Sequence, residues 1–218
     1  LYINGVLNTQ YNPRHLVTGD VWDPLALAGL LAPQGALDDV LLLGLGGGTA
    51  VHMLQHIVKP RGRITAVDSS ATIAQLAAQH FGAECDVLVN DARLAVDGCI
   101  GGEQRFSLII DDIFSRDGAQ AQRGYPFDAS WRDRLLSLWA ATGGVLVANL
   151  AGPREVAGAL NELPAAVRCA YVFAVERCEN RILALSSHET DRQTLLARVK
   201  SALPSAQHRR LRWRVTRK

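Results

Sequence analysis

From residue 39 onward, short apolar runs alternate with longer segments in which apolar residues recur at helical spacing. Seven apolar runs are predicted to be strands: 40–46, 63–68, 85–91, 106–112, 144–150, 169–176 and 181–187. Helical patterns cover about 49–58, 70–80, 128–141, 153–162 and 190–202. Strands that alternate with helices are typical of βαβ units, so the pattern predicts an α/β fold with a mostly parallel sheet.

Two intervals between the predicted strands depart from this rhythm. Residues 91–102 are too rich in glycine to be predicted as a helix. About three residues, near 178–180, separate the last two strands, which is too short for a parallel crossover and predicts an antiparallel hairpin. Five parallel strands followed by such a hairpin describe the methyltransferase-type variant of the doubly wound, Rossmann-like fold, here with seven strands.

The N-terminal region has a different pattern. Asn4-Gly5 lies between alternating apolar and polar residues, which predicts a β-hairpin. Pro24 is expected at the first position of a short helix. We therefore divide the chain into an N-terminal hairpin and linker at 1–20 and an α/β domain at 21–218.

Composition and charge narrow the class of protein. The chain has 218 residues, 48% hydrophobic and 20% charged, which suits one domain with a real core. A formal net charge of +2 favours neither a nucleic-acid nor a membrane partner. Six basic side chains lie in 209–218, where we expect a solvated tail or an edge strand rather than an RNA or lipid contact.

The spacings of the cysteines and histidines do not match those of metal-binding motifs. The four cysteines form no CxxC pair, and we expect reduced thiols in a cytoplasmic protein. His52 and His56 are four residues apart without an intervening Glu, so zinc is not expected. Neither a spanning helix nor a signal peptide is predicted, because no apolar stretch is long enough and no charged leader precedes one.

A glycine-rich loop, 44–50, joins the first predicted strand of the domain to the first helical pattern. Glycine permits positive φ and close approach of a ligand, and the N–H groups that follow stabilise polar ligand atoms. Asp68 ends the next strand, where an acid can accept hydrogen bonds from both hydroxyls of a ribose. These two features together predict a nucleotide site.

Acids at the ends of three successive predicted strands indicate which kind of nucleotide the site binds. Asp68 is followed by Asp91 and by Asp111-Asp112 at the ends of the next two strands. This succession is more typical of an adenosylmethionine site than of an NAD site, and Asp91 is placed to receive the adenine amino group. The predicted donor-binding residues are Gly44, Gly46, Gly47, Asp68, Ser69, Asp91 and Ala92.

Three motifs resemble those of the spermidine synthases, over residues 1 to about 152. The family's L-x-L-D-G-x-x-Q is similar to residues 1–8, its GGGDG to 46–50 and its GDA to 90–92. The resemblance implies a donor that is S-adenosylmethionine or its decarboxylated form, with Asp68 at the ribose, Asp91 and Ala92 around the adenine, and Asp112 as the catalytic aspartate. It also implies a homodimer.

The acceptor side departs from that family. Ser115 and Ser70 stand where the family has second acids, and Asn8 replaces a Gln. Each missing carboxylate removes a partner for a buried ammonium, which weakens the expectation of a polyamine acceptor. Asp111, Asp117 or Asp20 are candidate replacements, although Asp111 should point to the opposite face of its strand from Asp112. The candidate acceptor residues are Asn8, Asp20, Ser115 and Tyr125.

The leading hypothesis is a transferase that moves an aminopropyl or methyl group to a small-molecule amine, with Asp112 as the base. A small-molecule methyltransferase without polyamine activity, and a non-catalytic nucleotide-binding or dimerisation module, stay open as alternatives. An NAD-dependent oxidoreductase fits less well. The sequence has no Gly-x-Ser-x-Gly elbow and no P-loop, which argues against hydrolases and kinases of those kinds.

Overall fold

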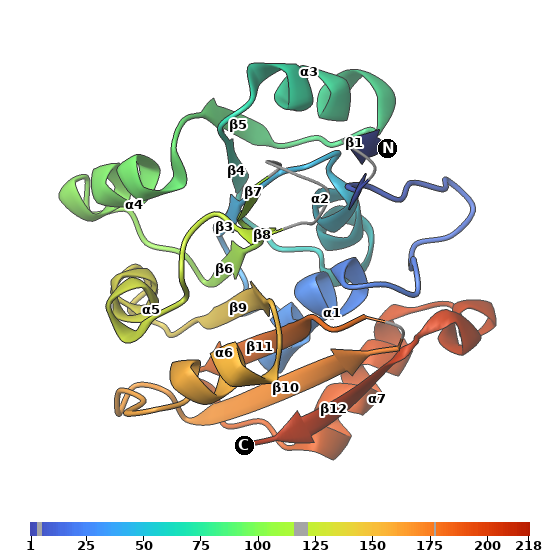
Figure 1. Cartoon of the computed structure of the whole chain (residues 1–218). Coiled ribbons are helices and arrows are strands. Elements are labelled where there is room, and N and C mark those ends of the chain that lie inside the picture. The colour runs from blue at the N-terminus through green and yellow to red at the C-terminus, as the bar shows by residue number, and fades with distance from the viewer. Residues whose placement is uncertain (4–5, 116–121, 177) are drawn as a thin grey trace.

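The computed structural model describes residues 1–3, 6–115, 122–176 and 178–218. Its central feature is a sheet in the strand order β12-β10-β11-β9-β6-β3-β4-β5 (Figure 1). The strands are β3 (Val40–Leu43), β4 (Ile64–Asp68), β5 (Asp86–Val89), β6 (Leu108–Asp111), β9 (Val145–Leu150), β10 (Cys169–Val175), β11 (Arg181–Ser186) and β12 (Trp213–Arg217). Five strands of this sheet, β9, β6, β3, β4 and β5, are parallel to one another. β10 and β11 form the antiparallel hairpin, as predicted, and β11 pairs antiparallel with β9.

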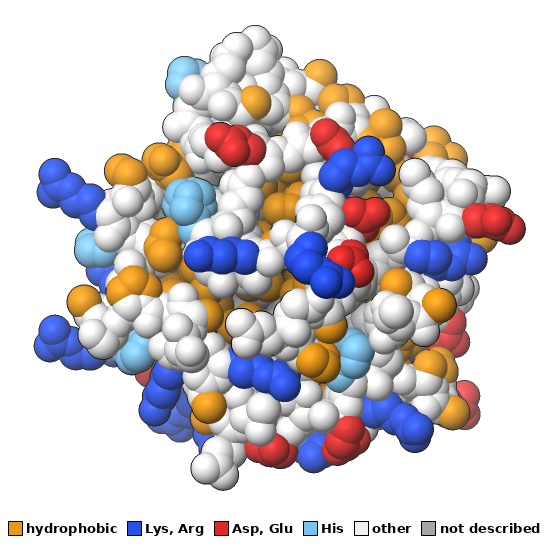
Figure 2. Space-filling view, turned by 180° about the vertical axis from the view of Figure 1, so that it is seen from behind, with side chains coloured by type: hydrophobic (Ala, Val, Ile, Leu, Met, Phe, Trp, Pro, Cys, Tyr) orange, Lys and Arg blue, Asp and Glu red, His pale blue; other side chains and the backbone are white. Residues whose placement is uncertain are grey.

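The described part of this sheet has eight strands instead of the predicted seven. The basic C-terminal tail supplies the extra one: β12 pairs antiparallel with β10 as an edge strand. Val215 of β12 is buried and Trp213 packs edge-to-face on Phe173 of β10, so apolar contact holds the tail to the sheet. On the face seen in Figure 2, Lys and Arg side chains are dispersed among acidic and apolar ones.

Helices cover both faces of the sheet, because the strands bury both sets of side chains. Val40 and Leu42 of β3 face one core cluster, whereas Leu41 and Leu43 face another. The first cluster packs under α1 (Trp22–Leu27), η1 (Ala28–Leu31), α2 (Thr49–Met53), η2 (Leu54–Val58), α3 (Ala71–His80) and α7 (Arg192–Ala202). The second packs under α4 (Ala92–Gly101), α5 (Ala129–Leu136) and α6 (Pro153–Ala159).

The helix α4 corrects the prediction for the glycine-rich interval 91–102. Asp91 caps it, since one carboxylate oxygen accepts hydrogen bonds from the backbone N–H groups of Arg93 and Leu94. The helix also buries an apolar stripe of Ala92, Ala95, Val96 and Cys99. This cap and this stripe outweigh the helix-weakening effect of the glycines.

Two other helical predictions need adjustment. The first helix begins at Trp22, so Pro24 is its third residue, which is still in the first turn where a missing N–H is harmless. The pattern over 49–58 divides into α2 and the π-helical turn η2. The predicted N-terminal hairpin forms from β1 (Tyr2–Ile3) and β2 (Val6–Leu7), although its Asn4-Gly5 turn lies outside the described residues.

The segment between β6 and α5 contains a second small sheet, which the sequence pattern did not indicate. β7 (Phe114–Ser115) pairs antiparallel with β8 (Gln122–Arg123).

The short 3-10 helix η3 (Ser205–Arg210) precedes β12, the last strand of the chain. None of the described helices has the length and apolar character needed to cross a bilayer. All four cysteines are free.

Candidate active site

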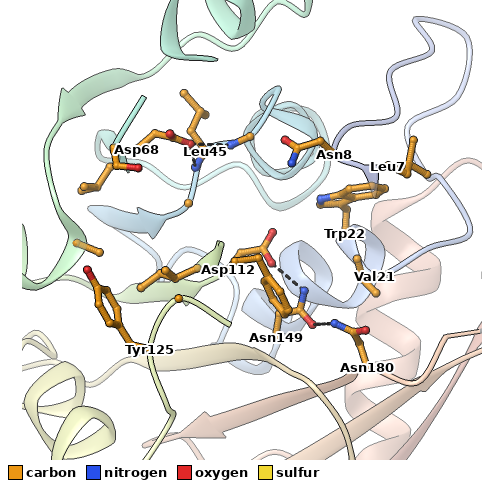
Figure 3. Close-up of a pocket in the computed structure, with 18 of the residues that line it drawn as sticks. Leu7, Asn8, Val21, Trp22, Leu45, Asp68, Asp112, Tyr125, Asn149 and Asn180 are labelled. Atoms are coloured by element: carbon orange, nitrogen blue, oxygen red, sulfur yellow. Dashed lines mark hydrogen bonds between the residues drawn. The ribbon is translucent and has the colours of Figure 1, made fainter. Parts of the chain in front are cut away.

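A cavity of about 680 Å³ lies at the carboxyl ends of the parallel strands (Figure 3). Ligands of open α/β sheets bind at this edge, and small-molecule sites commonly enclose 300–1,000 Å³. The structure brings most of the predicted site residues to its wall: Asn8, Asp20, Gly44, Gly46, Asp68, Ser69, Asp91, Ala92, Asp112 and Tyr125. Gly47 is not among the lining residues, and the side chain of Ser115 is outside the described part of the chain, as is Asp117.

The glycine loop is shaped by close contacts with neighbouring segments. Gly44 has φ of 91°, and a Cβ there would lie 2.3 Å from the backbone oxygen of Asp112. A Cβ on Gly47 would lie 2.2 Å from Oγ1 of Thr9. A side chain at either position would therefore collide with a neighbouring segment, either the residue that follows β6 or the N-terminal segment.

Thr9 is a site-building residue that the sequence analysis missed. Its buried hydroxyl accepts a hydrogen bond of 2.6 Å from the N–H of Gly47. The next residue, Gln10, exchanges backbone hydrogen bonds with the hydroxyl of Thr49 at the start of α2. No local pattern marks Thr9, because its partner is 38 residues away.

Asp68 fastens the glycine loop to the end of β4. One carboxylate oxygen accepts hydrogen bonds of 3.2 Å from the N–H groups of Leu45 and Gly46, and the other accepts one from Ser70. The side chain is buried yet lines the cavity. The loop and the acid thus form one rigid unit.

Asp91 lies just after β5, the strand beside β4, and Tyr125 contacts its carboxylate. The Tyr125 hydroxyl donates to the Asp91 carboxylate, and the Arg93 guanidinium lies 3.9 Å from the centre of the Tyr125 ring. The hydrogen bond from Tyr125 is the main reason that the pKa of Asp91 is lowered. Tyr125 therefore ties the segment after β8 to the N-terminus of α4.

Asp111 and Asp112 are sequence neighbours with opposite environments. Asp111 is fully buried, and its two oxygens accept hydrogen bonds of 3.0 and 2.9 Å from Arg123. Trp131 Nε1 donates a further bond of 2.8 Å to Asp111. Asp112 lines the cavity instead, as expected for adjacent strand-end residues that point to opposite faces.

Asp112 is held by a pair of asparagines. Asn149, at the end of β9, donates from Nδ2 to Asp112 Oδ1 across 2.7 Å, and Asn180 donates to Asn149 Oδ1 across 2.8 Å (Figure 3). Burial raises the pKa of Asp112 to about 6, with a smaller contribution from the negative charge of Asp111. A half-buried carboxylate with this pKa is suited to accept a proton near neutral pH.

Both asparagines were missed by the sequence analysis, although Asn149 carried a signal. It is a polar residue in an otherwise apolar strand run, at the same sheet edge as the acids. Asn180 carried none, because it lies in the turn of the β10–β11 hairpin and reaches the site only through the sheet order.

The polar atoms of the cavity fit a cationic nucleoside. Its described lining includes four carboxylates, on Asp20, Asp68, Asp91 and Asp112, and none of these described lining residues is Lys, Arg or His. Oδ1 of Asn8 is buried without a hydrogen-bond partner in the described chain. A buried acceptor of this kind is costly unless a ligand donor or water reaches it. Among the described residues, no group of His, Cys, Asp and Glu side chains is arranged to hold a metal.

Comparison with known proteins places the fold among those of methyltransferases. No protein-family profile matches the chain. The eEF1A lysine and N-terminal methyltransferase homolog of Drosophila pseudoobscura pseudoobscura is 34% identical over 118 residues, which are 51% of this chain and 17% of that protein. The match thus spans about one sixth of that relative's length.

Solved structures share the fold at low sequence identity. A spermidine synthase in complex with the transition-state analogue AdoDATO has a TM-score of 0.58 and 14% identity, covering 87% of this chain and 74% of the other. The O-methyltransferase TomG of Streptomyces achromogenes, in complex with SAM, has a TM-score of 0.54 and 18% identity, covering 75% and 79%. The chain has the Rossmann-like fold of the SAM-dependent methyltransferases.

Proposed function

We propose that this chain binds S-adenosylmethionine in the cavity and transfers its methyl group to an amine. The observation that carries the proposal is the convergence of Asp68, Asp91 and Asp112, from the ends of β4, β5 and β6, on one cavity beside the glycine loop. The partial similarity to proteins named as methyltransferases supports methyl transfer. S-adenosylmethionine, when bound, supplies an electrophilic methyl group on a sulfonium.

The donor side consists of the loop and the first two acids. Asp68 is proposed to accept hydrogen bonds from the ribose hydroxyls, and Asp91 with Ala92 to recognise the adenine. Ser69 and Gly46 also line the cavity. Asn8 Oδ1 is the proposed acceptor for the ammonium of the methionine part, because it is a buried oxygen that needs a donor.

Asp112 is the proposed base. An alkylammonium is not nucleophilic, so the acceptor must lose a proton before its nitrogen lone pair can attack. A carboxylate with a pKa of about 6 accepts a proton more readily than an ordinary aspartate, and Asn149 fixes its position. Asp20 adds a second carboxylate to the same wall and favours a cationic acceptor.

The acceptor class is a primary amine, either on a small molecule or on a polypeptide. The names of the Drosophila relatives specify lysine and N-terminal amines of a protein, which makes a polypeptide amine a specific candidate for this chain. The missing second acids, at Ser70 and Ser115, argue against a polyamine with two ammonium groups to be paired.

Aminopropyl transfer is the second candidate, and one observation favours it. The described cavity wall has four carboxylates and no basic side chain, so a donor without a carboxylate of its own meets less repulsion there. Decarboxylated S-adenosylmethionine is such a donor.

Two measurements test these proposals. Calorimetry with S-adenosylmethionine, its decarboxylated form, methylthioadenosine and NAD identifies the donor. Transfer from labelled donor to putrescine, free lysine and a short peptide with a free amino terminus identifies the acceptor, with the N-acetylated, lysine-free peptide as control. Binding of NAD alone would refute the donor, and donor binding without transfer to any amine would favour a non-catalytic nucleotide-binding module.

A further inference from the structure

Asp20, Val21 and Trp22 are consecutive residues that line one part of the cavity, here called the acceptor wall. It follows a loop at 16–19 that contains no regular secondary structure of its own. The position of the acceptor wall therefore depends on what holds this loop.

The C-terminal segment holds the loop from one side. Oε1 of Gln207, in η3, accepts hydrogen bonds from the backbone N–H groups of Leu16 and Val17, at 2.8 and 3.2 Å. Arg210 Nε donates to the backbone oxygen of Val17 across 3.3 Å. These contacts join residues about 190 positions apart in the chain.

Close packing supports the same attachment. Gly19 has φ of 80°, and a Cβ there would lie 3.2 Å from the backbone oxygen of Arg210. The side chain of Val17 is 1% exposed, so this part of the loop is anchored in the core. The loop and η3 are in direct contact along most of the loop.

Asp23 holds the loop from the other side. Its buried carboxylate accepts hydrogen bonds from the N–H and hydroxyl of Thr18 and from the N–H of Gly19. Asp20 then turns into the cavity, where its carboxylate accepts hydrogen bonds from Val21 N–H and from Gln10 Nε2. The loop is thus clamped between Asp23 and Gln207.

We infer that Gln207 is a positioning residue for the acceptor amine, acting through the loop on the acceptor wall. The inference rests on the proposed function, because it assigns the acceptor side of the same cavity. The donor side is built from other elements, namely the glycine loop and the ends of β4 and β5. Loss of Gln207 should therefore weaken acceptor binding and leave donor binding intact.

The atom of Gln207 that holds the loop is its side-chain oxygen, so one variant can remove this oxygen and another can keep it. Gln207→Ala removes the acceptor of two backbone N–H bonds, whereas Gln207→Glu keeps an oxygen at that place. Gln193→Ala is the matched control, since Gln193 is an exposed glutamine on α7. Hydrogen exchange over residues 16–22 measures the loop directly.

For Gln207→Ala we expect exchange over 16–22 to accelerate about tenfold, the scale of losing one or two hydrogen bonds, with β3 and β6 unchanged. The KM for the free-amino-terminus peptide should rise about tenfold while kcat and the affinity for S-adenosylmethionine stay within about twofold. Gln207→Glu should restore both values, and Gln193→Ala should match wild type.

Unchanged exchange over 16–22 in Gln207→Ala would overturn the inference, as would an equal rise in KM in Gln193→Ala. A loss of S-adenosylmethionine affinity equal to the loss of peptide affinity would assign Gln207 a general structural role instead. Failure of the wild-type protein to bind S-adenosylmethionine would refute the proposed function, while the exchange measurement would still decide whether Gln207 holds the loop.

Discussion

Asn149 donates to Asp112 through Nδ2 while its own Oδ1 accepts from Asn180. The amide can satisfy both partners in one orientation only, because its nitrogen donates and its oxygen accepts. Asp112 is thereby held with a fixed rotamer in a cavity that raises its pKa to about 6.

Replacing Asp112 by Asn should remove the base and preserve the shape of the side chain. We expect transfer to fall by about 10²- to 10⁴-fold, the usual contribution of a positioned base, with donor affinity changed by less than about threefold. Initial rates and calorimetry measure the two effects. Asp86→Asn, at an exposed acid of β5, is the control; equal activity of both variants would show that Asp112 is not the base.

The dependence of activity on pH should reflect the ionisation of Asp112. Activity limited by Asp112 should rise as pH increases through about 6, because the carboxylate must be ionised to accept a proton. The hydrogen bond from Asn149 lowers the pKa of Asp112, so Asn149→Ala should move this limb to higher pH. A limb that stays in place in Asn149→Ala would contradict the assignment.

Asp112 should also cost stability above pH 6. Its folded-state pKa of about 6 exceeds the ordinary value of 3.8, so the native state binds the proton first as pH falls, and stability contributed by this group increases on acidification from 6 to 4. We expect Asp112→Asn to raise the free energy of unfolding by on the order of 2 kcal/mol at pH 7.5, with the gain disappearing below about pH 4. Urea unfolding at several pH values measures this; a gain independent of pH would contradict it.

Removing the carboxylate of Asp111 should lower the free energy of unfolding, the opposite of the effect expected at Asp112. Asp111→Ala leaves Arg123, whose side chain is 5% exposed, without its buried carboxylate, and removing one partner of such a pair costs about 3–5 kcal/mol. We expect a lower urea midpoint at every pH from 6 to 8. Stability equal to wild type would show that Glu155, which also pairs with Arg123, compensates fully.

Two glycine-to-alanine variants compare the glycine loop with helix α4. Gly47→Ala places a Cβ 2.2 Å from Thr9 Oγ1, so we expect donor affinity to fall at least about tenfold as the loop is displaced. Gly98→Ala, in α4, meets nothing within 4 Å and should stabilise the protein by about 0.5–1 kcal/mol. Unchanged donor affinity in Gly47→Ala would show that the conformation of the glycine loop does not affect donor binding.

Several features of this protein followed from sequence pattern. The apolar runs predicted seven of the eight strands of the main sheet, all except β12, since strands buried between two layers of helices are continuously apolar. The edge strand β12 is one of the two alternatives expected for the basic tail. Helix α4 was less accessible, because its glycines hide a helix whose stability depends on the Asp91 cap and on buried contacts. The proposed domain boundary at residue 20, the homodimer and the cytoplasmic location stay predictions.

By itself, the sequence determined that Asp68, Asp91 and Asp112 would meet beside the glycine loop, because the carboxyl ends of parallel strands lie at one edge of a sheet. Only the tertiary structure decided that Arg123 pairs with Asp111, that Asn149 holds Asp112, and that Thr9 and Gln207 support the walls. These partners are 12 to 191 residues apart. Periodicity reports which side of an element is buried, whereas the partner across a buried contact is set by how distant elements pack.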